Sequence, residues 1–120
     1  MSQPIRIQRK RTKGFNLQAQ SPDGRQVVSV CRPGKWGNEF KVVQSGAAWA
    51  VFDVSYVGNA CWFDFDTKEE ATLWSIQAFV TGKQLFGWGE IEELRGKHLA
   101  CFCEIGSPCH ADELLKEANK

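Results

Sequence analysis

Residues 94–119, LRGKHLACFCEIGSPCHADELLKEAN, decide the fold, because they have the pattern of a strand, a tight loop and a helix. The segment HLACFCE, residues 98–104, is short and apolar, and Gly96 and Gly106 bound it. Such a segment is typical of a buried strand. Three of the five cysteines and one of the two histidines lie within ten residues, 101–110, so we look for chemistry here first.

The second half of the stretch predicts a helix. Ser107 can cap its start, and Pro108 suits the first helical position. Cys109 and His110 are then expected in the first turn, where free backbone amides favour an anion and lower the pKa of a thiol. Apolar residues follow at helical spacing: Ala111, Leu114, Leu115 and Ala118.

A second buried strand is predicted upstream, at QVVSVC, residues 26–31. It leads into RPGKWGNEF, residues 32–40, a loop by its glycines and proline. If residues 26–31 and 98–104 pair in parallel, the loops over residues 32–38 and 106–110 emerge at the same carboxyl edge of the sheet. Ligands bind at that edge in open α/β sheets. We therefore expect these two loops to form one pocket.

The middle of the chain predicts a β-hairpin followed by a helix. Residues 49–57 and 60–65 are rich in aromatic residues and flank a Gly-Asn turn. Their aromatic side chains suit a core, and an exposed platform for bases is the alternative. Thr67 and Glu70 form a capping box, and Gly82 is the expected end of that helix.

The remaining signals are a first strand over residues 5–8 and a short helix over residues 90–95. The order of elements predicts an α/β (or α+β) fold, with a small mixed sheet, an aromatic β-hairpin and two to three covering helices. At 120 residues, a single domain over residues 1–120 is expected.

The net charge of +1 hides an uneven distribution. The first forty residues hold eight basic and two acidic residues, whereas the rest hold seven basic and twelve acidic. A basic first third can attract the phosphates of nucleic acid, although a solvated basic edge is the simpler interpretation. The candidate phosphate contacts are Arg6, Arg9, Lys10, Arg11 and Lys13.

Composition also bears on the compartment. No apolar run approaches the roughly 20 residues of a membrane span, and the basic start lacks the apolar core of a secretory signal. An odd number of cysteines without an export signal favours reduced thiols. We therefore expect a cytoplasmic protein with no membrane partner.

The cysteines and His110 allow three interpretations. Cys109 and His110 can act as a nucleophile and a proton carrier, and this catalytic interpretation is the one we favour for the pair. The second is a zinc site that would also use Cys101 and Cys103, although adjacent ligands on one helical turn are awkward. The third is packing of Cys101 and Cys103 as small apolar side chains. We expect no cofactor, with zinc as the alternative.

The loop over residues 32–38 is the second candidate site. Arg32 and Lys35 can neutralise phosphate, Trp36 can stack on a base, and Asn38 can bind an amide-like edge. The alternative is that Trp36 fills the core and Asn38 caps a turn. Ser107, from the other loop, completes the expected ligand site.

These two places carry a resemblance. The stretches CRPGKWGNEF and LRGKHLACFCEIGSPCHADELL resemble a small bacterial and phage family known as domain of unknown function 4326. The resemblance covers about residues 5–41 and 94–118, with Glu39 where that family usually has proline. It implies a bacterial cytoplasm or a phage-infected host cell, and it implies no particular reaction.

The sequence thus predicts an enzyme, or an enzyme-like ligand-binding protein, for a nucleotide, nucleoside or nucleic-acid base. Its pocket would lie between the loops over residues 32–38 and 106–110. One alternative is a non-enzymatic nucleic-acid-binding module that uses the basic N-terminal segment, with or without a stabilising metal. Another is a phage adaptor that docks on a host protein.

Overall fold

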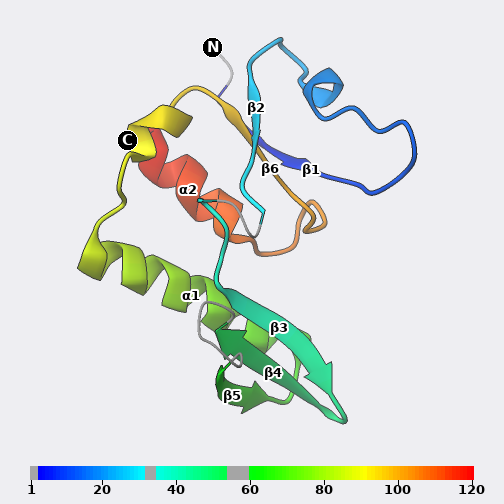
Figure 1. Cartoon of the computed structure of the whole chain (residues 1–120), viewed down its shortest axis with the longest axis vertical. Coiled ribbons are helices and arrows are strands. Elements are labelled where there is room, and N and C mark those ends of the chain that lie inside the picture. The colour runs from blue at the N-terminus through cyan, green and yellow to red at the C-terminus, as the bar shows by residue number, and fades with distance from the viewer. Residues whose placement is uncertain (1–2, 32–34, 54–59) are drawn as a thin grey trace. The chain divides into compact units, whose positions relative to one another are not determined.

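The computed structural model describes residues 3–31, 35–53 and 60–120. Its contacts group into two compact units, one made of Met1–Gly37 and Trp88–Lys120 and the other of Asn38–Gly87. Each unit has its own sheet and one long helix (Figure 1). The α/β (or α+β) class is confirmed, with the parallel and the antiparallel strands in separate sheets.

The first unit is built on a three-stranded parallel sheet in the order β1-β6-β2. The central strand β6 (His98–Cys101) is buried at every position, because neighbours cover both of its edges and both of its faces. β1 (Arg6–Gln8) pairs with it on one side and β2 (Val27–Ser29) on the other. The predicted parallel pairing of the two apolar segments is therefore confirmed.

Helix α2 (His110–Ala118) packs against β6 and β1 (Figure 1). The sequence predicted its start at Ser107, and this was wrong, because the N-cap residue is Cys109 and the helix begins at His110. Residues 104–107 instead form a turn closed by a hydrogen bond from the Ser107 amide to the Glu104 carbonyl, 3.1 Å long. The buried side of α2 consists of His110, Ala111, Leu114 and Ala118.

Two short 3-10 helices and a turn complete this unit. They are η1 (Gln18–Gln20) and η2 (Ile91–Leu94), and the second matches the short helix predicted over residues 90–95. The turn around Asp23 is attached to β6 by His98, whose Nε2 lies 2.7 Å from an Asp23 carboxylate oxygen. The long connection between β1 and β2 is thereby attached to the centre of the sheet.

The second unit is an antiparallel sheet in the order β3-β4-β5 with α1 packed on it. Its strands are β3 (Phe40–Ser45), β4 (Ala48–Asp53) and β5 (Ala60–Phe65). The antiparallel pairing of β4 with β5 confirms the predicted hairpin. Its Gly-Asn turn lies outside the described residues. Ala50 and Val51 are buried in β4.

Helix α1 (Lys68–Phe86) begins where the sequence predicted it. Thr67 is the N-cap, and its hydroxyl accepts a 3.1 Å hydrogen bond from the Glu70 amide. The predicted end at Gly82 was wrong, because the helix continues to Phe86 and ends at Gly87, where φ is +94°. A glycine inside a helix costs only about 1 kcal/mol relative to alanine, which packing can offset. None of the described helices has the length and apolarity that crossing a bilayer requires.

Candidate sulfur site and basic segment

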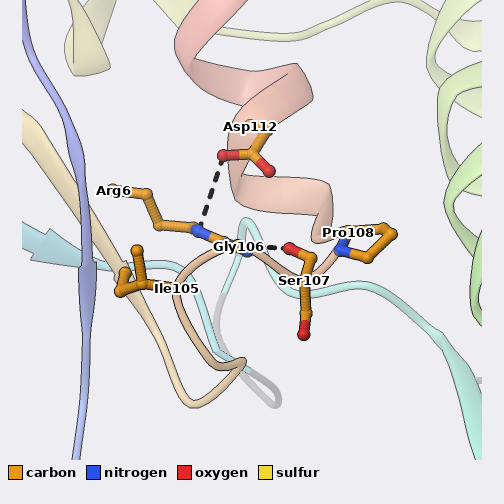
Figure 2. Close-up of a pocket in the computed structure, with 6 residues that line it drawn as sticks. All are labelled: Arg6, Ile105, Gly106, Ser107, Pro108 and Asp112. Carbon is orange, nitrogen blue, oxygen red and sulfur yellow. Dashed lines mark hydrogen bonds and ion pairs between the residues drawn. The ribbon is translucent and has the colours of Figure 1, made fainter.

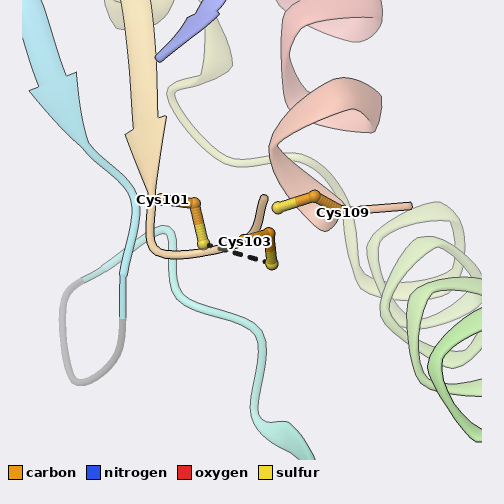
Figure 3. A group of neighbouring side chains, drawn as sticks. All are labelled: Cys101, Cys103 and Cys109. Atoms are coloured by element: carbon orange, nitrogen blue, oxygen red, sulfur yellow. Dashed lines mark hydrogen bonds between the residues drawn. The ribbon is translucent and has the colours of Figure 1, made fainter. Parts of the chain in front are cut away.

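Three cysteines converge where β6 meets α2 (Figure 3). Cys101 is the last residue of β6, Cys103 lies in the loop that follows, and Cys109 is the N-cap of α2. Their three sulfur atoms all lie within 4.8 Å of one another, and those of Cys101 and Cys103 are 3.8 Å apart. Cys101 and Cys109 are buried and Cys103 is half-buried. This group of thiols could hold a metal ion.

Local backbone geometry explains the convergence. Because β6 ends at Cys101, Cys103 is not bound to the alternation of an extended strand, and its sulfur can turn back towards that of Cys101. Cys109 has extended backbone angles, φ −153° and ψ 145°, so its side chain does not follow the helical spacing of α2. The sulfurs of Cys101, Cys103 and Cys109 therefore converge from a strand end, a loop and a helix N-cap.

His110 is the first residue of α2, and each of its ring nitrogens lies close to a possible hydrogen-bond partner. Nε2 lies 2.8 Å from the carbonyl oxygen of Val30, the residue that follows β2. A carbonyl can only accept, so Nε2 carries the proton and Nδ1 of the neutral ring presents a lone pair. Nδ1 lies 3.7 Å from the sulfur of Cys109.

Arg6 closes the site from β1. Its side chain is only 7% exposed, and Nη2 donates to the carbonyls of Glu104 at 3.0 Å and Ser107 at 2.8 Å. Nε lies 3.5 Å from a carboxylate oxygen of Asp112. Nη1 is buried and has no nitrogen or oxygen partner in the described part of the chain. The guanidinium instead faces the thiol of Cys109.

The thiols of Cys103 and Cys109 do not titrate alike. Hydrogen bonds from Cys101 and Cys103, together with the Ala111 amide and the Arg6 guanidinium, lower the pKa of Cys109 to about 3 against the opposing effect of burial. Hydrogen bonds with Cys101 and Cys109, together with burial, raise the pKa of Cys103 far above its usual value. The two shifts are opposite because Cys109 accepts and Cys103 donates in the hydrogen bond that the two thiols share.

An open hollow of about 460 Å³ adjoins the sulfur cluster (Figure 2). Arg6 and Asp112 stand on one side of it, and the loop after β6 forms the rest. Ser107, predicted as a ligand-binding residue, is among its lining residues. The hollow is lined by Arg6, Ile105, Gly106, Ser107, Pro108 and Asp112.

The predicted ligand-binding residues of the loop over residues 32–38 have surroundings other than those of Ser107. Arg32 lies outside the described residues. Lys35 forms ion pairs with Glu93 at 3.3 Å and Glu90 at 3.9 Å, and Trp36 is buried at 7% exposure. Lys35 Nζ also lies 5.1 Å from the centroid of the Trp36 ring, so each of the two side chains has a partner within its own unit.

Asn38 belongs to the other unit. Its Oδ1 accepts a 2.9 Å hydrogen bond from the Phe40 amide, and its Nδ2 donates to the Ser75 carbonyl at 3.4 Å. These contacts join the start of β3 to α1, as expected of a buried amide that caps a turn. A shared pocket between the loops over residues 32–38 and 106–110 stays a prediction.

The predicted basic segment divides into two parts. Arg6 points into the sulfur site, whereas Arg9 and Arg11 lie against the ring of Phe102, with their guanidinium carbons 5.1 Å and 4.1 Å from its centroid. Arg9 also donates to the Ser29 hydroxyl at 2.9 Å. Lys10 and Lys13 are exposed.

Sequence reasoning missed two contributions. Phe102 stands between the two cysteines of C-F-C, and strand alternation could have indicated that it points away from them. The role of Arg6 beside Cys109 had no signal in the sequence, because only the β1-β6 pairing brings the two together.

Comparison with known proteins gives one match. No curated protein and no solved structure matches the chain. A family model does match it, over residues 7–120, which includes both motifs and the hairpin between them. The resemblance drawn from CRPGKWGNEF and LRGKHLACFC is therefore confirmed. The chain belongs to the family described as Domain of unknown function (DUF4326).

Proposed function

We propose that this protein binds the phosphates of a nucleotide or nucleic acid at the carboxyl end of its parallel sheet. One observation carries the proposal: within the described residues, none of the cations Arg9, Lys10, Arg11 and Lys13 forms an ion pair with a carboxylate. Four unneutralised charges in five residues are a natural phosphate contact.

The position of these cations supports the same proposal. They directly follow β1, and Phe102 directly follows β6, so they share the edge at which open α/β sheets bind ligands. Stacking on Phe102 orients the guanidinium groups of Arg9 and Arg11. Arg9 Nη1 donates to Ser29, and the other nitrogens of the two groups can bind phosphate oxygens. The phosphate is assigned to this segment and not to the hollow, because Asp112 would repel an anion there.

Salt dependence of binding tests the proposal. Fluorescence anisotropy with labelled duplex DNA, single-stranded DNA and a nucleoside triphosphate, each at several salt concentrations, measures it. The logarithm of the binding constant for duplex DNA is expected to fall linearly with the logarithm of the salt concentration, with a slope of about −0.9 per phosphate contact. Arg11→Ala and Lys13→Ala should each reduce that slope by about 1. Lys116→Ala, an exposed lysine in the last turn of α2, is the matched control and should leave the slope unchanged. Absence of binding by all three probes at low salt would reject the proposal.

A second candidate function, an enzyme reaction at Cys109 and His110, is favoured by their geometry. The Val30 carbonyl orients the imidazole so that Nδ1 faces the thiol, as a base faces a nucleophile. Nucleotide turnover that is lost in both Cys109→Ala and His110→Ala, with phosphate binding retained, would support it. The low exposure of Cys109, 3%, argues against direct attack on a large substrate.

We also propose that the three clustered cysteines bind zinc, because soft thiolate ligands favour that ion. Zinc held there would attach the loop after β6 to α2 beside the cations. The adaptor alternative stays a prediction, because much of the aromatic hairpin lies outside the described residues.

A further inference from the structure

The sulfur cluster has the dimensions of a tetrahedral metal site. Zinc–sulfur bonds of about 2.3 Å place two sulfurs on a tetrahedral ion about 3.8 Å apart. The sulfurs of Cys101 and Cys103 are 3.8 Å apart, and that of Cys109 lies within 4.8 Å of both. Bringing every pair to the tetrahedral spacing therefore requires a movement of about 1 Å or less.

A ring nitrogen of His110 lies next to the sulfur of Cys109. A zinc–nitrogen bond of about 2.0 Å would place that nitrogen about 3.6 Å from a bound sulfur. Nδ1 of His110 is 3.7 Å from the sulfur of Cys109. Metal-bound histidines usually donate their other ring N–H to a carboxylate or backbone carbonyl, and His110 has this arrangement with Val30 at 2.8 Å.

We propose that Cys101, Cys103, Cys109 and Nδ1 of His110 bind one zinc ion. Binding takes place with the cysteines as thiolates, any thiol protons being released to water, so no oxidant or reductant is needed. The centre attaches the end of β6 to the start of α2. It stands independently of phosphate binding, because none of its ligands belongs to the basic segment.

Charge balance gives independent support. A zinc ion with three thiolates and a neutral imidazole carries a net charge of −1. Arg6 supplies a buried positive charge beside Cys109, and its Nη1 has no nitrogen or oxygen partner in the described chain. A buried donor left unpaired is costly, whereas a metal-bound thiolate is an acceptor for it. The anionic centre thus explains an otherwise unpaired guanidinium nitrogen.

A zinc centre reverses the expectation of no cofactor, and the backbone geometry at the four ligands favours it. The C-x-C pair is not confined to one strand, since β6 ends at Cys101 and Cys103 is in a loop. Cys109 and His110 do not share a regular helical turn either, since Cys109 is an extended N-cap. Adjacent residues can therefore direct both ligand atoms to one ion.

Metal content of the full chain tests the proposal. The protein is purified under reducing conditions without a histidine tag, and zinc is measured by elemental analysis. About one zinc per chain is expected in wild type and in Cys31→Ser, a half-buried thiol outside the cluster that serves as the matched control. Cys103→Ser should lose most of the metal. Wild type that is folded by circular dichroism but contains no zinc, and takes up none on titration against a chelator, would overturn the proposal.

Cobalt substitution tests the ligand set by spectroscopy, first in wild type and then in a variant. Co²⁺ added to metal-depleted wild type should give the intense visible bands of a tetrahedral ion and a thiolate-to-metal charge-transfer band. His110→Ala should keep the charge-transfer band and change the visible bands. An unchanged spectrum in His110→Ala would remove His110 from the ligand set. A disulfide among the three cysteines of freshly reduced protein, detected by mass spectrometry as the loss of two hydrogens, would overturn the proposal of a zinc centre.

Discussion

The imidazole of His98 joins the turn at Asp23 to the centre of the parallel sheet. Its Nε2 lies 2.7 Å from Oδ1 of Asp23, and its Nδ1 accepts a 3.0 Å hydrogen bond from the amide of Ile5. Because Nδ1 is an acceptor, Nε2 carries the proton and donates it to the carboxylate. A ring that is 1% exposed thus has both nitrogens paired.

Asp23→Ala should lower the melting temperature at neutral pH, because it leaves the buried Nε2–H of His98 without its acceptor. Asp23→Asn keeps an oxygen acceptor without the charge, so its melting temperature should fall by less than that of Asp23→Ala. Thermal denaturation followed by circular dichroism measures both. Equal melting temperatures for wild type and Asp23→Ala would show that water replaces the carboxylate at no cost.

The effect of Asp23 should depend on pH. The hydrogen bond from His98, then that from the Arg25 amide and the charge of the Arg25 side chain, lower the pKa of Asp23 below its usual value near 3.8. A depressed pKa means that the stabilisation is complete above the unfolded pKa and is lost as the pH falls through the folded value. The difference between wild type and Asp23→Ala should therefore be constant from pH 7 to about pH 5 and shrink below about pH 4. A difference that persists unchanged to pH 2 would contradict this origin.

The two glycines at the end of α1 should respond oppositely to alanine. Gly82 lies inside the helix with nothing within 4 Å of an added Cβ, so Gly82→Ala should stabilise by about 0.5–1 kcal/mol. Gly87 has φ +94°, where a side chain is strained, so Gly87→Ala should destabilise by about 1–2 kcal/mol. Urea denaturation measures both. Effects of the same sign would show that this helix end is misplaced.

Two hydroxyls that look like helix caps in the sequence should differ in energy. Thr67→Ala should cost about 1 kcal/mol, because the Thr67 hydroxyl accepts the Glu70 amide. Ser107→Ala should change stability by less than about 0.5 kcal/mol, because the contacts of Ser107 in the described structure are made by its backbone. Urea denaturation of the two variants checks the ranking, and a larger loss in Ser107→Ala would reverse it.

Arg6→Ala should loosen the loop between β6 and α2. It removes the hydrogen bonds to the carbonyls of Glu104 and Ser107, and we expect a loss of about 1–3 kcal/mol. Amide hydrogen exchange should accelerate at residues 104–109. Arg11→Ala, which removes an exposed cation of the same strand end, is the control and should leave that exchange unchanged. Slow exchange in Arg6→Ala would mean that the loop is held by other contacts.

The sequence predicted local structure correctly where the interacting residues are close to one another along the chain. The Thr67–Glu70 cap and the apolar HLAC strand are examples, because their partners or their burial follow from residues a few positions away. The same local reasoning misplaced the start of α2. Ser107 and Pro108 have the composition of a helix start, but Arg6 holds the carbonyls of Glu104 and Ser107 in a loop, and Arg6 comes from a distant strand.

The sequence alone determined the family, the apolar strands, the basic segment and which side chains could carry chemistry. Tertiary structure alone decided how those side chains combine. Cys101 and Cys109 are brought together by the packing of α2 on β6, and Arg6 joins them through the β1-β6 pairing. Such contacts depend on strand order and register, which spacing along the chain does not encode. For the same reason, only the fold turned Arg6 from a surface cation into the buried partner of a thiol.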